Sequence, residues 1–99
     1  MISINFNLAT RQASEYEQCA EELFQQHNRL KNIITEVRGA WKGETSAMYI
    51  RKLEVFRSQL NDEATKLRRD ATAFRAKIEE LRRLDEEAAA AMAEMANNR

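Results

Sequence analysis

Apolar residues recur along the first half of the chain at the spacing of a single helix face. Between residues 11 and 40 the intervals alternate between four and three residues, at Tyr16, Ala20, Leu23, His27, Leu30, Ile34 and Val37. This spacing places the side chains on one side of an α-helix. Cys19, Phe24 and Ile33 form a second, adjacent row. A helix with two apolar rows can contact two neighbours, so we expect a helix over residues 11–40 with more than one packing partner.

A seven-residue repeat marks the second half of the chain. It runs through Leu53, Leu60, Leu67, Phe74, Leu81, Ala88 and Met95. Further apolar residues lie between these positions, at Phe56, Ala64, Ala71, Ile78 and Leu84, while Glu63, Asp70 and Lys77 interrupt the second position of the repeat. A sustained heptad is typical of a coiled-coil-like helix. We expect a helix over residues 46–90 that overhangs the first, and a fraying tail over residues 91–99.

The N-terminal residues 1–10 alternate between apolar and polar side chains, at Ile2, Ile4, Phe6 and Leu8. Alternation is the period of a β-strand. Because the chain offers no second strand, we expect an extended arm that leads into the first helix, with Asn7 or Thr10 as its cap.

The segment between the two expected helices holds both glycines and the only tryptophan, in a chain without proline. A glycine can adopt the left-handed conformation that ends a helix, and Thr45 or Ser46 can cap the next one. We therefore expect an all-α fold: a single domain over residues 1–99, an antiparallel two-helix hairpin with its turn at residues 41–45.

Two helices leave part of each apolar face in water, so this hairpin is expected to pair with another into a four-helix bundle. The side chains predicted for the core of the hairpin or of the dimer are Tyr16, Leu23, Phe24, Leu30, Ile34, Val37, Leu53, Phe56, Leu60, Leu67 and Phe74.

Charge and composition exclude several classes of function. Sixteen basic and sixteen acidic residues give a net charge of zero, which argues against a nucleic-acid-binding arm. The basic stretch of residues 66–83 is followed by the acidic stretch of residues 85–94, a dipolar pattern that suits a partner helix better than a phosphate backbone. No segment is apolar enough for membrane insertion. The N-terminus lacks the features of a signal peptide, so we expect synthesis in the cytoplasm.

Catalytic and metal-binding constellations are not apparent. Cys19 and His27 are each the only residue of their type, and they lie eight residues apart on one helix. The paired glutamates are adjacent in sequence and therefore point apart. Catalysis needs groups that converge in a pocket, which two helices do not enclose. We predict a protein that is not an enzyme and binds no metal or cofactor.

The sequence Trp41-Lys42-Gly43, at the joint between two helical arms, resembles the Trp-x-Gly motif of the WXG-100 superfamily. These are the small ESAT-like proteins handled by type VII secretion systems. The resemblance extends over nearly the whole chain and includes Ile4, Leu8, Ala13, Tyr16 and Tyr49. It implies a small interaction protein, either a secreted substrate or the co-secreted partner of one, that is exported folded and without a cleaved signal peptide.

The resemblance also implies partners and an export signal. The expected partners are a second copy of the chain, a related small protein or a larger secreted protein, and the secretion ATPase. Members of the family often carry a C-terminal signal in which a tyrosine precedes an acid by four residues. Here Leu81 and Asp85 hold those positions, with leucine in place of tyrosine.

Three interpretations stay open beside this one. The protein can travel with a partner that supplies the export signal. It can act as a cytosolic adaptor or chaperone for a larger type VII toxin. It can also be a structural coiled-coil protein unrelated to secretion.

Overall fold

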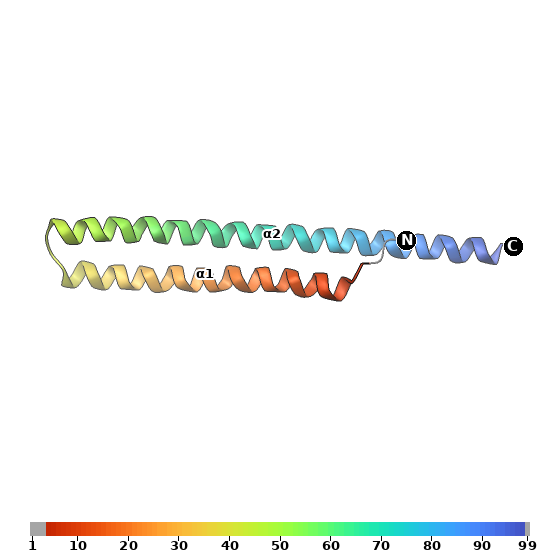
Figure 1. Ribbon diagram of the computed structural model, residues 1–99, viewed down its shortest axis with the longest axis horizontal. Helices are drawn as coiled ribbons and strands as arrows, with labels where there is room; N and C mark the ends of the chain where they lie inside the picture. The colour runs from red at the N-terminus through yellow and green to blue at the C-terminus, as the bar shows by residue number, and fades with distance from the viewer. Residues whose placement is uncertain (1–3, 99) are drawn as a thin grey trace.

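The computed structural model describes residues 4–98 and consists of two long α-helices joined by a short turn (Figure 1). Helix α1 spans Phe6–Ala40 and helix α2 spans Glu44–Asn97. The helices run antiparallel, and α2 continues past the N-terminal end of α1. The molecule is therefore a rod, with extents of 85 × 15 × 14 Å. This architecture confirms the predicted all-α, two-helix hairpin.

Helix α1 begins earlier than the sequence pattern predicts. Asn5 is its N-cap, and the Asn5 side-chain oxygen accepts a hydrogen bond from the backbone N–H of Leu8 at 3.0 Å. Asparagine is among the best N-cap residues because its short side chain reaches this donor. The predicted extended arm is therefore wrong for residues 6–10, and neither Asn7 nor Thr10 caps the helix. Residues 1–3 of that arm lie outside the described residues.

The turn occupies residues 41–43 and depends on one glycine. Trp41 ends α1 in an extended conformation, and its backbone N–H donates to the carbonyl oxygen of Val37 at 2.8 Å. Gly43 has φ 108° and ψ 176°, a backbone conformation that is essentially restricted to glycine. Gly39, by contrast, is an ordinary helical residue near the end of α1. The conformational freedom of glycine is thus needed at Gly43 and not at Gly39.

Helix α2 also starts earlier than predicted, at Glu44, with Gly43 as its N-cap and no side-chain cap. The predicted caps at Thr45 and Ser46 are not formed. The Ser46 hydroxyl instead donates back to the carbonyl oxygen of Gly43 at 3.3 Å, and Ser46 is buried beneath the turn. At its other end α2 remains helical through most of the predicted fraying tail, to Asn97. Alanine, which fills much of that stretch, is the strongest helix former.

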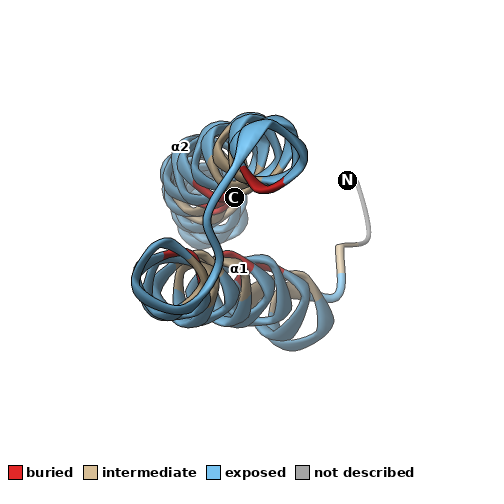
Figure 2. Cartoon of the chain, turned by 90° about the vertical axis from the view of Figure 1, so that its left-hand side faces the viewer, coloured by how far each residue is buried: buried red, intermediate tan, exposed pale blue. Residues whose placement is uncertain are grey.

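The buried residues lie on the facing sides of the two helices and form a narrow seam (Figure 2). Four of them are alanines: Ala13, Ala20, Ala64 and Ala71. Small side chains at a contact let two helices approach closely. The seam is therefore thin, and among the described residues no large side chain is fully buried.

The second seam position of α2 differs from the prediction by one residue. The heptad pattern placed Phe56 and Leu84 there together with Ala64, Ala71 and Ile78, but the Phe56 and Leu84 side chains are 52% and 49% exposed. Buried positions fall one residue later, at Ala64, Ala71 and Ile78. The sequence pattern also names Ala64, Ala71 and Ile78, and the close helix contact buries these and not the bulkier Phe56 and Leu84. Glu63, Asp70 and Lys77 consequently do not interrupt the seam.

The two glycines offer a matched test of the turn. We expect Gly39→Ala to stabilise the hairpin by roughly 0.5–1 kcal/mol, because alanine favours the helix and a Cβ there meets open space. Gly43→Ala should destabilise it by roughly 1–3 kcal/mol, because alanine rarely adopts the Gly43 conformation. Urea denaturation followed by circular dichroism measures both. Equal effects of the two changes would contradict this account of the turn.

Candidate interaction surface

Three ion pairs between the helices lie along one side of the seam, which we call the ion-paired side. They join Arg38 to Glu54 at 3.2 Å, Arg68 to Glu21 at 3.7 Å, and Arg75 to Glu17. All six side chains are at least partly exposed. Exposed ion pairs add little stability individually. Repeated along the rod, however, they define one register in which residue 38 lies level with residue 54 and residue 17 with residue 75.

Arginine–aromatic contacts reinforce the same side. The Arg68 guanidinium lies 4.4 Å from the centre of the Phe24 ring, and the Arg82 guanidinium lies 5.4 Å from that of Phe6. A guanidinium over an aromatic ring is attracted by the electron density of the ring face. The ion-paired side is therefore covered by the protein's own arginines for most of the length of α1.

Glu17 and Arg75 form the most extensive of these contacts. The Arg75 guanidinium donates to both oxygens of the Glu17 carboxylate and also to the Ser14 hydroxyl at 2.7 Å. The hydrogen bond from Arg75, aided by its charge, lowers the pKa of Glu17, and the same bond raises the pKa of Arg75. Both groups are thus held in their charged forms.

The opposite side of the seam has no ion pair between the helices among residues 4–98, and we call it the bare side. Its inner rows are Cys19, Gln26 and Ile33 on α1, with Tyr49, Phe56, Glu63, Asp70 and Lys77 on α2. These residues occupy the heptad position that flanks the seam opposite to the ion-paired residues. In the register of the ion pairs, residue 33 lies level with residue 59, about one helical turn from Phe56.

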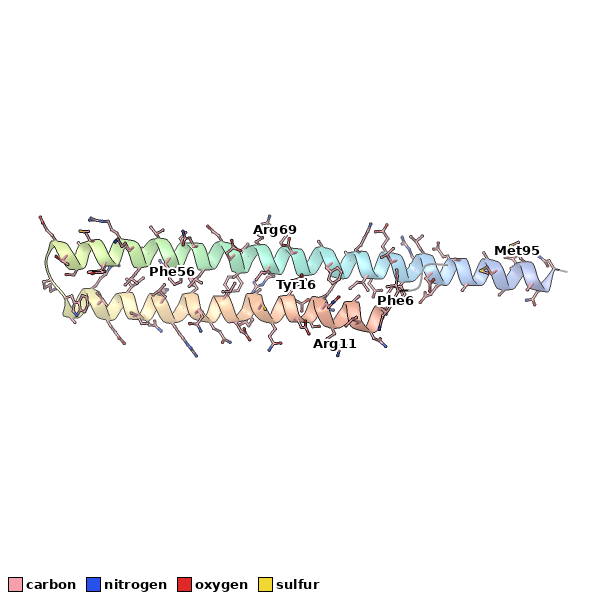
Figure 3. The ribbon with its side chains drawn as sticks, in the orientation of Figure 1. Phe6, Arg11, Tyr16, Phe56, Arg69 and Met95 are labelled. Carbon is pink, nitrogen blue, oxygen red and sulfur yellow. The ribbon has the colours of Figure 1, made fainter. Side chains whose placement is uncertain are left out.

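The half of the bare side nearest the turn is apolar. Ile33, Tyr49 and Phe56 are 48%, 54% and 52% exposed. Figure 3 shows Phe56 and Tyr16 beside the gap between the helices, whereas Arg11 and Arg69 point away from it. Tyr16 lies in the other half of the rod, farther from the turn, where its ring meets the Phe74 ring edge-on with 6.4 Å between the ring centres. Large apolar side chains beside a thin seam are typical of a face that contacts another protein.

The turn end of the rod is apolar as well. Trp41 is more than half exposed, and so are Met48 and Val55 on the outer face of α2. Shallow grooves here are lined by Met48, Lys52 and their neighbours on α2. Among the described residues, no aromatic or arginine–aromatic contact involves the Trp41 ring.

The predicted core residues divide into three groups. Ile34 is buried, and Tyr16 and Phe56 are exposed. The others are half-buried: Leu23, Phe24, Leu30, Val37, Leu53, Leu60, Leu67 and Phe74. A single hairpin thus covers these side chains only in part. The sequence pattern did not single out Met48 and Val55, because their exposure depends on the rotation of α2 against α1.

Leu81 and Asp85, which the sequence predicts as a degenerate export signal, lie near the start of α1, where Arg82 covers Phe6. Both are half-buried on α2. Their four-residue spacing places both side chains on one face of α2. This is the face that packs against α1 along the seam. Beyond them, in the part of α2 that extends past the start of α1, Met92 and Met95 are exposed. Figure 3 shows Met95 there.

Within residues 4–98 there is no cluster of three or more metal-ligating side chains. No helix in that range has the length and hydropathy required to cross a membrane.

The chain is thus a helical rod with a thin seam, one ion-paired side and one bare side whose half nearest the turn is apolar. The sequence model of the PPE family matches residues 8–99, nearly the whole chain, and the protein belongs to this family. PPE proteins are related to the substrates of type VII secretion systems. The match shows this relationship and not the membership of the WXG-100 superfamily that Trp41-Lys42-Gly43 predicts. No curated protein and no solved structure matches the chain.

The Glu17–Arg75 pair predicts a dependence of stability on pH. Because the folded-state pKa of Glu17 is depressed, its contribution is present above the unfolded pKa and is lost as the pH falls through the folded value. We expect wild type to lose stability relative to Glu17→Gln as the pH drops below about 4. Unfolding free energies measured between pH 7 and about pH 3 test this.

Glu22→Gln is the matched control, since Glu22 has no ion-pair partner among the described residues. If wild type and Glu17→Gln follow the same pH profile, the pair does not stabilise the fold.

Proposed function

We propose that the protein is a small, non-enzymatic interaction protein of a type VII secretion system, as a secreted substrate or the co-secreted partner of one. The observation that carries this proposal is the PPE match over residues 8–99, and the described part of this range, residues 8–98, forms one hairpin. A thin rod without an enclosed core has a large exposed surface for contacts with other proteins. It has no enclosed pocket in which catalytic groups could converge around a substrate. Recognition by other proteins is the activity that such a rod supports.

We infer that the functional unit is a pair of hairpins in a four-helix bundle. Support comes from the half-buried seam residues and from the apolar half of the bare side. Stable, specific interfaces bury roughly 1,200–2,000 Å² in total, which one side of a rod this long can supply. A second copy of the chain is the proposed partner. A related small protein or a larger secreted protein is the alternative.

The Trp41-Lys42-Gly43 turn supports a contact with the secretion ATPase or with another part of the machinery. Gly43 is explained by the backbone of the turn, as its φ of 108° shows. Trp41 is not explained by packing, because 56% of its surface is exposed. An exposed tryptophan at the tip of a rod is suited to fill a pocket in a partner, where such residues contribute strongly to binding.

Trp41→Ala tests this role. In the source organism we expect the wild-type protein in the medium only when the type VII ATPase is intact. Trp41→Ala should keep its helicity and its pairing, measured by circular dichroism and light scattering, yet lose most of its export. Met48→Ala is the matched control, since Met48 is 52% exposed near the same end of the rod.

Other outcomes would replace this proposal. An unfolded Trp41→Ala variant would make the tryptophan structural only. Retention of the wild-type protein in the cytoplasm while a larger toxin is exported would favour the adaptor role. Export that does not depend on the ATPase would remove the type VII assignment altogether.

We also propose that Leu81 and Asp85 act as a degenerate export signal. In that case Asp85→Ala should abolish export without changing helicity or pairing, because one partly exposed acid is usually worth under about 0.5 kcal/mol. Glu86→Ala is the control, as the next acid on the same helix but fully on its exposed surface. If both variants are exported normally and deletion of a partner stops export, the partner supplies the signal.

A further inference from the structure

We propose that copies of the chain join end to end through two different surfaces of α2. The first is the part of α2 that extends past the start of α1, which we call the overhang (Figure 1). The second is the outer face of α2 near the turn. Because this contact uses neither the bare side nor the ion-paired side, it is separate from the pairing proposed above, and the two contacts can form together.

The overhang continues the seam face of α2 where α1 is no longer opposite. In the register of the ion pairs, Phe6, the first residue of α1, lies level with residue 86, so the overhang is residues 87–97. Met92 holds the same heptad position as the buried Ile78. Met92 and Met95 are nevertheless 59% and 70% exposed. A helix placed in line with α1 would cover this face.

The outer face of α2, turned away from α1, carries large apolar side chains near the turn. Met48 and Val55 lie seven residues apart on it and are 52% and 58% exposed. A shallow groove here is lined by these two side chains together with Arg51 and Lys52. Between residues 57 and 83 no large apolar side chain of α2 is exposed. The apolar part of the outer face is therefore confined to the turn end of the rod.

The charges of the two surfaces are opposite. Residues 85–98 hold four acids and no base. Near the turn, Lys42, Arg51 and Lys52 have no ion-pair partner among the described residues. Residues 41–53 contain a single acid. An acidic apolar surface and a basic apolar surface are complementary, so each attracts the other end of a second copy.

Contacts between like ends are disfavoured by the same charges. Two overhangs would bring the acids of one copy against the acids of the next. Two turn ends would bring Arg51 and Lys52 against their equivalents. Like charges in contact raise the free energy of a complex. The favoured contact is therefore heterologous, with the overhang of one copy on the outer face of another.

The two surfaces also agree in length and spacing. The overhang is about 16 Å long at about 1.5 Å per residue, and residues 45–55 cover the same length of α2. Ala88 and Met95 are seven residues apart, as Met48 and Val55 are. Two parallel helices can therefore bring one apolar pair against the other. In this arrangement α2 of the second copy lies in line with α1 of the first and continues its seam.

A heterologous contact leaves one unused surface at each end of the assembly, so it repeats and builds an open chain. An overlap this short buries less than the roughly 1,200 Å² of a stable, specific interface. The contact is therefore weak. We expect chain growth at protein concentrations on the order of hundreds of micromolar. The pairing into a four-helix bundle is measured at much lower concentration, which separates the two kinds of association.

Mixing two blocked variants tests the contact. Arg51→Glu with Val55→Gln blocks the outer face, and Met92→Gln with Met95→Gln blocks the overhang. At hundreds of micromolar the mean mass of wild type should roughly double or more, whereas each variant alone should keep its micromolar mass, since each has one intact surface. An equimolar mixture combines an intact overhang with an intact outer face and should associate again. Sedimentation equilibrium measures the masses.

Arg69→Glu and Ala90→Gln are the matched controls. Arg69 lies about five helical turns beyond Arg51 on the outer face, and Ala90 lies on the side of the overhang away from Met92. Both variants should associate as wild type does. Circular dichroism checks that every variant keeps the helicity of wild type.

Association of the mixture, and of neither blocked variant alone, supports the end-to-end contact. A wild type that keeps its micromolar mass overturns it, and so does a mixture that fails to associate. Loss of association in either control overturns the assigned faces. If wild type does not grow but binds phosphatidylglycerol vesicles, and Arg51→Glu with Val55→Gln does not, the outer face contacts a membrane surface instead.

The other proposals are judged by different measurements. The mass at micromolar concentration reports the pairing into a four-helix bundle. Export, measured on wild type, Trp41→Ala and the control Met48→Ala, does not involve the end-to-end contact and reports the role in secretion. Failure of the contact and failure of the proposed function are therefore distinguishable.

Discussion

The close approach of the two helices along an alanine seam is the constraint on which the rest of the structure depends. Ala13, Ala20, Ala64 and Ala71 are all at most 1% exposed, and such small side chains leave no room between the helices for larger ones. Large apolar residues are consequently displaced to the two edges of the contact, where a single hairpin covers them only in part. The close approach of the helices therefore holds the hairpin together and also leaves apolar side chains exposed at its edges.

The two edges of the seam differ in the contacts that cover them. On one edge, arginines of α2 cover Phe6 and Phe24 and pair with acids of α1. On the other edge no comparable contact exists among the described residues. Individual surface ion pairs stabilise a fold little. Their main consequence here is that they fix the register of α1 against α2 and cover one side of the seam. The asymmetry therefore leaves one side of the rod without a cover of arginines.

Several features could be predicted from the sequence, and the exceptions have identifiable causes. The hairpin and the position of its turn follow from two long periodic segments separated by Gly43 and Trp41. The start of α1 could not be predicted from the alternation of Ile4, Phe6 and Leu8, because a local hydrogen bond from the Leu8 N–H to Asn5 overrides that pattern. At the second seam position the pattern named both the bulky Phe56 and the small Ala64, and only the tight helix contact selects the small residue.

The sequence by itself determined that the chain forms two long helices, that they reverse at the Trp-x-Gly turn, and that each has one apolar face. These properties depend on helix propensity and on spacing within each segment, which are local. Only the tertiary structure decided which edge of that face is covered by arginines and which remains bare. It also decided the register, in which Arg38 lies level with Glu54. Rotation and register of one helix against another depend on side chains distant in sequence, such as Glu17 and Arg75, whose pairing no local pattern encodes.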